Sequence, residues 1–316
     1  CDAFLSGSHN SCTRSDTHGY VNGGELFPHY SVRNTIQKFA FASSADGTDV
    51  GDLLQALGSN QGNSSGTYGY CCGGTTSTPG VFVDIIQKYS VTADLNATDV
   101  GNLTVQKILT TEANSTTHGY CMGGAVGTKD VIDKFPFASD TNAVDVGDAT
   151  VAGNYGATCS SATYGYLSGG NVRGNVIDKN SFTSDGNSTD VGDQAVTKAH
   201  NAGASSYTHG YDCGGGPNNP AARESILKFS FSSDGNSSDI ANLTVGRGTI
   251  SGQSYITHGY IAGAYGNNTI DKFSFSSDAD ATDVGDLPTT HGYRAGTSSR
   301  TYGYVAGGHP NLNSIE

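Results

Sequence analysis

The stretch Thr257-His258-Gly259-Tyr260-Ile261-Ala262-Gly263, followed by Ile270-Asp271-Lys272-Phe273-Ser274-Phe275, decides the fold of this chain. Versions of both segments recur along its 316 residues. The Thr-(His/Tyr)-Gly-Tyr segment begins at Thr17, Thr67, Thr117, Thr163, Thr208, Thr257 and Thr301. The second segment has its lysine at Lys38, Lys88, Lys134, Lys179, Lys228 and Lys272. The chain is therefore an array of similar units.

The spacing of these segments separates a rigid scaffold from a variable loop. Each of those lysines precedes the second tyrosine of the next Thr-(His/Tyr)-Gly-Tyr segment by 32 residues, as from Lys38 to Tyr70 and from Lys272 to Tyr304. The distance from the preceding glycine pair to the lysine instead varies from 8 residues to 14. Because surface loops tolerate insertions and packed strands do not, we expect strands in the constant part and a loop in the variable part.

Within one unit the pattern is that of short strands. Residues 272–275 alternate polar and apolar side chains, which is typical of a half-buried strand. A turn-rich segment follows at 276–280, and Thr282-Asp283-Val284 begins a returning strand. No window combines a helical period with helix caps. Four short strands in about 47 residues are typical of one blade of a β-propeller.

We therefore predict an all-β fold, a seven-bladed β-propeller that forms a single domain over residues 1–316. The predicted blades cover approximately 1–52, 53–102, 103–148, 149–193, 194–242, 243–286 and 287–316. The last blade is expected to be incomplete, because the chain finishes at Ile315-Glu316, where the other copies continue with lysine. Either a neighbouring chain supplies the remaining hairpin or the sequence is a window on a longer protein, and we favour the window.

The order of a strand ending in Gly-Gly, a variable loop, an apolar strand and a returning strand resembles the kelch repeat. In that family the double glycine ends the second strand of a blade. The matching pairs are Gly23-Gly24, Gly73-Gly74, Gly123-Gly124, Gly169-Gly170, Gly214-Gly215 and Gly307-Gly308. The kelch tryptophan is absent, since the chain contains no Trp. The repeat also resembles uncharacterised repeat proteins of marine phages, cyanophages especially, and of marine bacteria.

The charge balance excludes two classes of partner. The formal net charge is −13, with 16 Lys plus Arg against 29 Asp plus Glu. Such a surface repels nucleic acid and anionic membranes, and no apolar run reaches the length of a membrane span. We expect no nucleic-acid partner and no membrane insertion. The composition suits a protein that stays soluble in salty water, in a virion or at an extracellular or cell surface.

Polar residues of the repeat offer candidate sites, each with a structural alternative. Histidine alternates with tyrosine in Thr-(His/Tyr)-Gly-Tyr, which favours a hydrogen bond or aromatic stack between blades over a metal ring. The trio Asp185, Asn187 and Asp190 has the oxygen ligands that calcium prefers, but Asx-turns need the same residues. We expect no metal and keep calcium at this trio as the alternative. Lys272 and Asp283 flank a hairpin turn and are predicted to form a cross-strand salt bridge.

Catalysis finds little support in the sequence. There is no Gly-x-Ser-x-Gly elbow, no lone cysteine with fixed histidine partners and no phosphate loop. We therefore expect no catalytic residue and no cofactor. A glycan-cleaving enzyme stays open as an alternative, because two carboxylates could serve among the 29 acidic residues.

Three loops differ most between the units, at residues 25–33, 75–83 and 217–223. All leave the same edge of their blades, so we expect them on one face of the ring, where exposed aromatic and arginine side chains anchor interfaces. Loop drift without selection for binding is the alternative. The predicted partner-binding residues are Phe27, His29, Tyr30, Arg33, Pro79, Phe82, Asn218, Asn219 and Arg223.

The leading hypothesis from the sequence is a non-enzymatic structural or adhesion protein of an extracellular assembly. We expect a phage virion component, in a fibre, a tail or attached to the capsid. Its partners would be other virion or surface-assembly proteins, or a host-surface glycan. The alternative is a carbohydrate-binding surface propeller of a marine bacterium.

Overall fold

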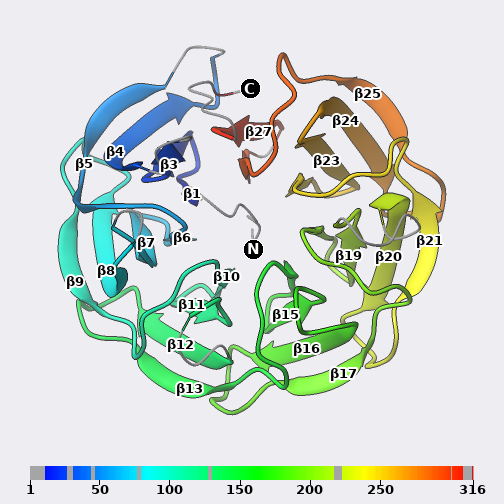
Figure 1. Cartoon of the computed structure of the whole chain (residues 1–316), viewed down its shortest axis with the longest axis horizontal. Helices are drawn as coiled ribbons and strands as arrows, with labels where there is room; N and C mark the ends of the chain where they lie inside the picture. Colours follow the sequence, from blue (N-terminus) through cyan, green and yellow to red (C-terminus); the bar gives the residue numbers. More distant parts are fainter. Residues whose placement is uncertain are drawn as a thin grey trace.

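The computed structural model of the chain is a ring of antiparallel sheets around a central axis (Figure 1). The structure describes residues 11–26, 31–43, 47–76, 80–126, 130–216, 223–299, 301–308 and 315. These residues form six blades, each with four consecutively paired strands, and a two-stranded sheet. The prediction of an all-β propeller with four-stranded blades is confirmed. At the position of the predicted last blade, the described residues form the two-stranded sheet.

The strands follow one order in every blade. Blade 1 contains β1 (Ser11–Arg14), β2 (His18–Asn22), β4 (Ser31–Ala40) and β5 (Thr48–Leu57), with the short β3 (Glu25–Leu26) paired to β4. Blade 2 contains β6 (Gln61–Ser64), β7 (Tyr68–Thr75), β8 (Phe82–Ser90) and β9 (Thr98–Asn102). Blade 3 contains β10 (Thr111–Asn114), β11 (His118–Met122), β12 (Val131–Pro136) and β13 (Val144–Asp148).

Blade 4 contains β14 (Ala157–Ser160), β15 (Tyr164–Ser168), β16 (Val176–Ser181) and β17 (Thr189–Asp193). Blade 5 contains β18 (Ala202–Ser205), β19 (His209–Cys213), β20 (Ser225–Ser230) and β21 (Ser238–Asn242). Blade 6 contains β22 (Ser251–Ser254), β23 (His258–Ala264), β24 (Asn267–Ser274) and β25 (Thr282–Asp286). The two-stranded sheet pairs β26 (Ala295–Ser298) with β27 (Gly303–Ala306).

The ring closes through its innermost strands. The first strand of each blade lies nearest the axis and the fourth lies outermost (Figure 1). Neighbouring first strands contact one another, and β26 contacts both β22 and β1. Because successive strands are antiparallel, the second-to-third loops and the connections between blades lie on one face of the ring, here called the loop face. The first-to-second and third-to-fourth turns lie on the opposite face, here called the turn face.

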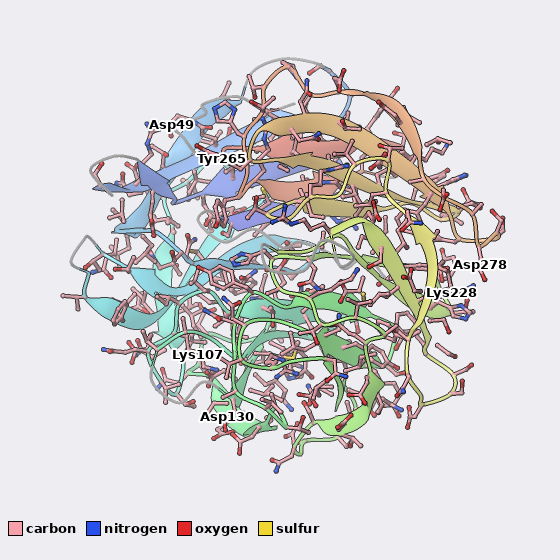
Figure 2. The ribbon with its side chains drawn as sticks, turned by 45° about the vertical axis from the view of Figure 1, so that its right-hand side comes forward. Asp49, Lys107, Asp130, Lys228, Tyr265 and Asp278 are labelled. Atoms are coloured by element: carbon pink, nitrogen blue, oxygen red, sulfur yellow. The ribbon has the colours of Figure 1, made fainter. Side chains whose placement is uncertain are left out.

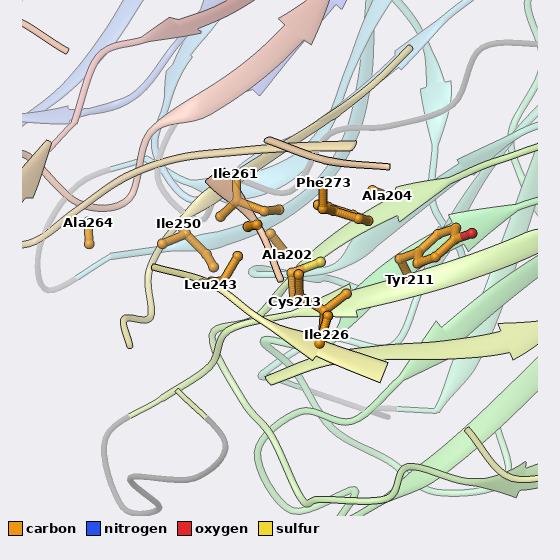
Figure 3. Close-up of a cluster of buried hydrophobic side chains, with 12 residues drawn as sticks. Ala202, Ala204, Tyr211, Cys213, Ile226, Leu243, Ile250, Ile261, Ala264 and Phe273 are labelled. Atoms are coloured by element: carbon orange, nitrogen blue, oxygen red, sulfur yellow. The ribbon is translucent and has the colours of Figure 1, made fainter. Parts of the chain in front are cut away.

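The core lies between blades and is built from small repeated contacts. Figure 3 shows one such cluster, in which Tyr211 and Ile226 of blade 5 lie near Ile261 and Phe273 of blade 6. Tyr211 is fully buried, its ring stacks on Phe275 with centroids 4.7 Å apart, and its hydroxyl donates to the Phe275 carbonyl oxygen at 3.4 Å. Aromatic pairs of this geometry add stability beyond the area they bury. The hydroxyls of Tyr20, Tyr70, Tyr120, Tyr166 and Tyr304 likewise donate to a backbone carbonyl oxygen of the following blade.

The inner strands approach so closely that only small residues fit at some positions. A Cβ added to Gly203 would lie 2.0 Å from the Thr158 carbonyl oxygen of the preceding blade. A Cβ on Gly252 would lie 2.4 Å from the Gly203 carbonyl oxygen. The high glycine content is thus explained in part by backbone packing around the axis. Cys71 and Cys121 are fully buried, where they act as small hydrophobic residues.

The lysines of the repeat form ion pairs between blades and not within them. Lys228 of blade 5 lies beside Asp278 in the turn of blade 6, with Nζ and Oδ1 2.8 Å apart (Figure 2). The equivalent pairs are Lys38–Asp94, Lys88–Asp140, Lys134–Asp185 and Lys179–Asp234. The predicted bridge between Lys272 and Asp283 is wrong. A register shift in β24 and β25 places Lys272 opposite Thr282, and Asp283 opposite Asp271.

The histidines of the repeat also have local partners. His118 Nδ1 lies 2.8 Å from Oγ1 of Thr117, the preceding residue, and His18, His209 and His258 repeat this contact. The hydrogen bond predicted between blades is therefore found within a single turn.

Candidate interaction surface on the loop face

The predicted partner-binding residues fall partly within the described chain. Arg33, Phe82 and Arg223 are described and half-buried. The remaining predicted residues lie outside the described residues: Phe27, His29, Tyr30, Pro79, Asn218 and Asn219. The described part of the loop face consists of the bases of the long loops and the connections between blades.

The bases of the two N-terminal long loops are extensions of the sheets. Arg33 lies in β4, and its backbone N–H donates to the Gly24 carbonyl oxygen at 3.0 Å. Phe82 begins β8 opposite Thr75, the last residue of β7. Arg223 is held differently, since its carbonyl oxygen accepts a bond of 2.8 Å from the Arg247 N–H. The structure thus anchors all three loops to the rigid blades.

A cluster of aromatic side chains lies near the axis on the loop face. Tyr155 of blade 4 contacts His200 of blade 5, with ring centroids 4.2 Å apart. His200 also meets Tyr293, which precedes β26, edge to face at 6.1 Å. His200 and Tyr293 belong to sectors that are not adjacent in the ring, so they can touch only close to the axis. All three rings are half-buried.

One backbone conformation places this cluster. Tyr155, His200 and Tyr293 occupy the same repeat position, with φ values of 58°, 56° and 56°, as does Thr249 at 58°. Left-handed conformations are costly for residues other than glycine, so the surrounding contacts must hold them. The backbone bonds His200 N–H to Tyr155 O, Thr249 N–H to His200 O and Tyr293 N–H to Thr249 O, of 2.9–3.1 Å, provide that support. Sequence analysis missed this cluster, although alignment of the units brings these residues into register.

Exposed apolar side chains also occur on the loop face. Val172 is 86% exposed and Tyr265 is 68% exposed. Both sit in second-to-third connections, and Figure 2 labels Tyr265. Apolar groups that remain in solvent at loop tips are available to a partner. The sequence offered a signal for Tyr265, because it is a lone aromatic residue in the shortest of these loops.

Buried ion pairs lie beneath the loop face. Lys107 Nζ is 2.9 Å from Asp133 Oδ2 and also donates to the carbonyl oxygens of Cys121 and Val131. Arg247 and Asp271 form the same pair in blade 6 at 2.7 Å. Each of these charges has its counter-ion within one blade. Their conformational role is to join the start of a blade to its second and third strands.

The sequence carries a signal for these pairs that the initial interpretation missed. In blade 2 both positions are uncharged, with Leu57 in place of the cation and Gln87 in place of the aspartate. In blade 4 Gly153 occupies the position of the cation. Arg173, in the second-to-third loop of the same blade, forms the ion pair with Asp178 instead, at 2.7 Å. Charge and counter-charge are thus lost or replaced together, as the cost of an unpaired buried charge requires.

Blade 5 uses a rearranged version of the pair. Lys198 donates to the carbonyl oxygens of Asp212 and Ser225 at 3.0 and 2.7 Å. The Asp212 carboxylate accepts bonds from Ser168 at 2.8 Å and Asn201 at 2.6 Å. Burial raises the pKa of Asp212, which the charge of Lys198 offsets in part. Burial likewise lowers the pKa of Lys198, and the Asp212 charge opposes that change.

The oxygens of the alternative calcium trio are directed at three different partners. Asp185 pairs with Lys134 of the preceding blade at 2.5 Å. Asn187 Oδ1 accepts from the Asp148 N–H at 3.1 Å, and Asp190 Oδ1 accepts from the Gly192 N–H at 3.1 Å. This arrangement serves blade-to-blade bonding and an Asx-turn. Among the described residues, no group of three or more His, Cys, Asp or Glu side chains is placed to hold a metal ion.

The turn face carries a different set of exposed residues. Tyr207 is 76% exposed and Tyr302 is 64% exposed, and Tyr68, Tyr255 and Ile256 are also exposed. All lie in or beside first-to-second turns of their sheets. The partner-binding residues predicted from the sequence all belong to the loop face, so this set was not predicted.

Comparison with protein-family models and with curated proteins found no match for this chain. The resemblance to kelch repeats and to marine phage proteins therefore stays a prediction. In the part of the chain that the structure describes, no helix has the length and hydropathy needed to span a membrane.

Proposed function

We propose that this chain is a non-enzymatic adhesion or structural component of an extracellular assembly, and that it binds its partner through the loop face. One observation carries the proposal: the loops of variable length, the exposed Val172 and Tyr265, and the axial aromatic cluster all belong to that face. Aromatic and apolar groups presented by a rigid scaffold are the usual anchors of an interface. Lys38, Lys88, Lys134, Lys179 and Lys228, by contrast, are paired with aspartates of the scaffold.

The proposal includes a kelch-like ring of seven sectors, in which β26 and β27 are the inner half of a seventh blade. Tyr304 supports this, because its hydroxyl donates to the Phe41 carbonyl oxygen of blade 1 at 2.9 Å and its ring stacks on Phe41 with centroids 5.0 Å apart. Tyr211 makes the same contact with Phe275 in the next complete blade. The two-stranded sheet thus uses the contact by which one blade meets the next.

A phage virion is the assembly that we propose, in a fibre, a tail or attached to the capsid. The sequence of the repeat, which resembles marine phage proteins, and the acidic composition of the chain support this assignment. The partner would be a neighbouring virion protein or a host surface, and neither nucleic acid nor a membrane interior is proposed as a ligand.

Replacement of the long loops tests the adhesion proposal. Residues 25–33 and 75–83 would be exchanged for the short connection at 265–269, and binding of the labelled protein to intact marine cyanobacterial cells would be measured. We expect the exchange to abolish binding, while the turn-face variant Tyr207→Ser retains it. Unchanged cell binding by the loop-exchanged protein would refute the proposal.

A carbohydrate-binding propeller of a bacterial surface is the second candidate. The exposed tyrosines of the turn face favour it, because sugar rings stack on exposed aromatic side chains. A glycan array would be probed with the unmodified chain, with Tyr207→Ala and Tyr302→Ala, and with the loop variant Phe82→Ala. Glycan binding lost only in the turn-face variants would move the site to that face. Polysaccharide turnover would instead support the less favoured glycan-cleaving enzyme.

A further inference from the structure

The boundary between blade 2 and blade 3 has a buried thiol on each side. Cys72 of β7 and Cys121 of β11 belong to one hydrophobic cluster, together with Tyr70 and Phe135. Successive residues of a strand point to opposite faces of its sheet. Cys72 therefore faces blade 3, while its neighbour Cys71 faces blade 1 and belongs to a different cluster. The two thiols that share the boundary are those of Cys72 and Cys121.

One buried amide contacts both sulfur atoms. Asn63 Nδ2 lies 3.9 Å from Cys72 Sγ and 3.6 Å from Cys121 Sγ. Burial raises the pKa of the Cys72 thiol, and the neighbouring Cys121 thiol raises it further. A disulfide bond brings two sulfur atoms to about 2.05 Å. Two thiols that already share one donor reach that distance through a local approach of their strands.

A second boundary shows that side chains at these two repeat positions meet. Between blades 4 and 5 the equivalent residues are Ser168 and Asp212, and Ser168 Oγ donates to Asp212 Oδ2 at 2.8 Å. At no other boundary of the aligned units do both positions hold cysteine. The residue pairs at three of the other boundaries are Asn22 and Cys71, Met122 and Leu167, and Cys213 and Ile261.

We propose that Cys72 and Cys121 are a redox-sensitive pair that closes a disulfide bond between blade 2 and blade 3. The oxidant is a small disulfide such as oxidised glutathione. The thiolate of one cysteine attacks it, which forms a mixed disulfide and releases one glutathione thiol. The second cysteine attacks the protein sulfur of that mixed disulfide and releases the other glutathione thiol. The two protons and two electrons that the cysteines lose are thus taken up by the two glutathione molecules.

Burial decides when this bond forms. The thiolate is the reactive form of cysteine, and a buried thiol with a raised pKa reacts slowly. The bond therefore forms while the chain folds or when the boundary opens. It would close a loop of about 50 residues and stabilise the ring by restricting the unfolded chain. Oxidising surroundings, such as those of an extracellular assembly, preserve such a bond.

The test produces the full chain in two ways, by export to the bacterial periplasm and by refolding in a buffer of reduced and oxidised glutathione. Remaining thiols are blocked with iodoacetamide, and the chain is digested with trypsin in urea without reductant. We expect mass spectrometry to find the peptides 39–88 and 108–128 joined, and separated again by a reductant. The melting temperature of the oxidised chain should exceed that of the reduced chain by about 5 °C.

Single variants identify the two cysteines. Cys72→Ser and Cys121→Ser should each abolish the joined peptides and the gain in melting temperature. The matched control is Cys71→Ser, which changes the same tryptic peptide but faces blade 1, and it should keep both. Circular dichroism of each variant shows that it is folded. Complete alkylation of all cysteines in the folded chain, or joined peptides that survive Cys72→Ser, would overturn the proposal. The loop exchange described above leaves the bond unchanged, so a failure of either proposal can be told from a failure of the other.

Discussion

Removal of one partner from a buried ion pair should destabilise the ring far more than removal of both. Lys107 and Asp133 are fully buried, 2.9 Å apart, and blade 2 holds the uncharged residues Leu57 and Gln87 at the same positions. Lys107→Leu leaves Asp133 with bonds from the N–H and hydroxyl of Thr104 but without a counter-ion. Breaking such a pair costs about 3–5 kcal/mol of unfolding free energy.

The double variant Lys107→Leu with Asp133→Gln places at this site the same two uncharged residue types that blade 2 has at the equivalent positions. We expect its unfolding free energy to lie within about 1–2 kcal/mol of the unmodified chain, because no uncompensated charge is left in the interior. Urea denaturation of both single variants and the double variant, followed by circular dichroism, measures the coupling. If the double variant lost as much stability as the two single variants combined, the reasoning from compensated charge would be refuted.

Three further predictions concern the scaffold. Gly210→Ala should cost about 1–3 kcal/mol of unfolding free energy, because its Cβ would lie 2.3 Å from the Phe229 ring. The control Gly303→Ala, where the nearest atom to the added Cβ is 3.3 Å away, should cost about 0.5 kcal/mol or less. Equal losses for the two variants in urea denaturation would contradict this prediction. Lys179→Met removes a partly exposed ion pair and should change the unfolding free energy by less than about 1 kcal/mol, with any difference shrinking as salt is added during the same melts. Burial and the nearby lysine charge lower the pKa of His18, His118, His209 and His258 below the ordinary value of 6.5. The unfolded chain therefore binds more protons in acid, and the unfolding free energy should fall as the pH drops below 6.5. Replacement of all four histidines by tyrosine should flatten this pH profile, and an unchanged slope would count against the prediction.

Much of the fold could be predicted because the chain repeats it. The constant spacing from lysine to tyrosine fixes which segments pack as strands, and the antiparallel order then assigns the variable loops to one face. The partner of each lysine could not be predicted in this way. Symmetry about the hairpin turn suggested Asp283 for Lys272, but the register shift between Ile270 and Asp271 turns Asp283 away from it. A local sequence pattern does not report contacts between blades.

The candidate site was harder to predict than the scaffold. Tyr155, His200 and Tyr293 are far apart in sequence and meet only because the ring brings their sectors to one axis. The exposed Tyr207 and Tyr302 were overlooked for a different reason, since the sequence analysis weighed variation in loop length and not variation inside turns of constant length. Both features become visible once the units are aligned with the topology in hand.

A crystal structure of the full chain tests the central claim most directly, namely that a repeated tyrosine contact joins neighbouring blades and joins the sheet of β26 and β27 to blade 1. We expect six four-stranded blades, with β26 and β27 between blade 6 and blade 1 and the Tyr304 hydroxyl on the Phe41 carbonyl oxygen. A ring closed by blade 6 directly against blade 1, or an open stack of sheets without an axis, would contradict the account.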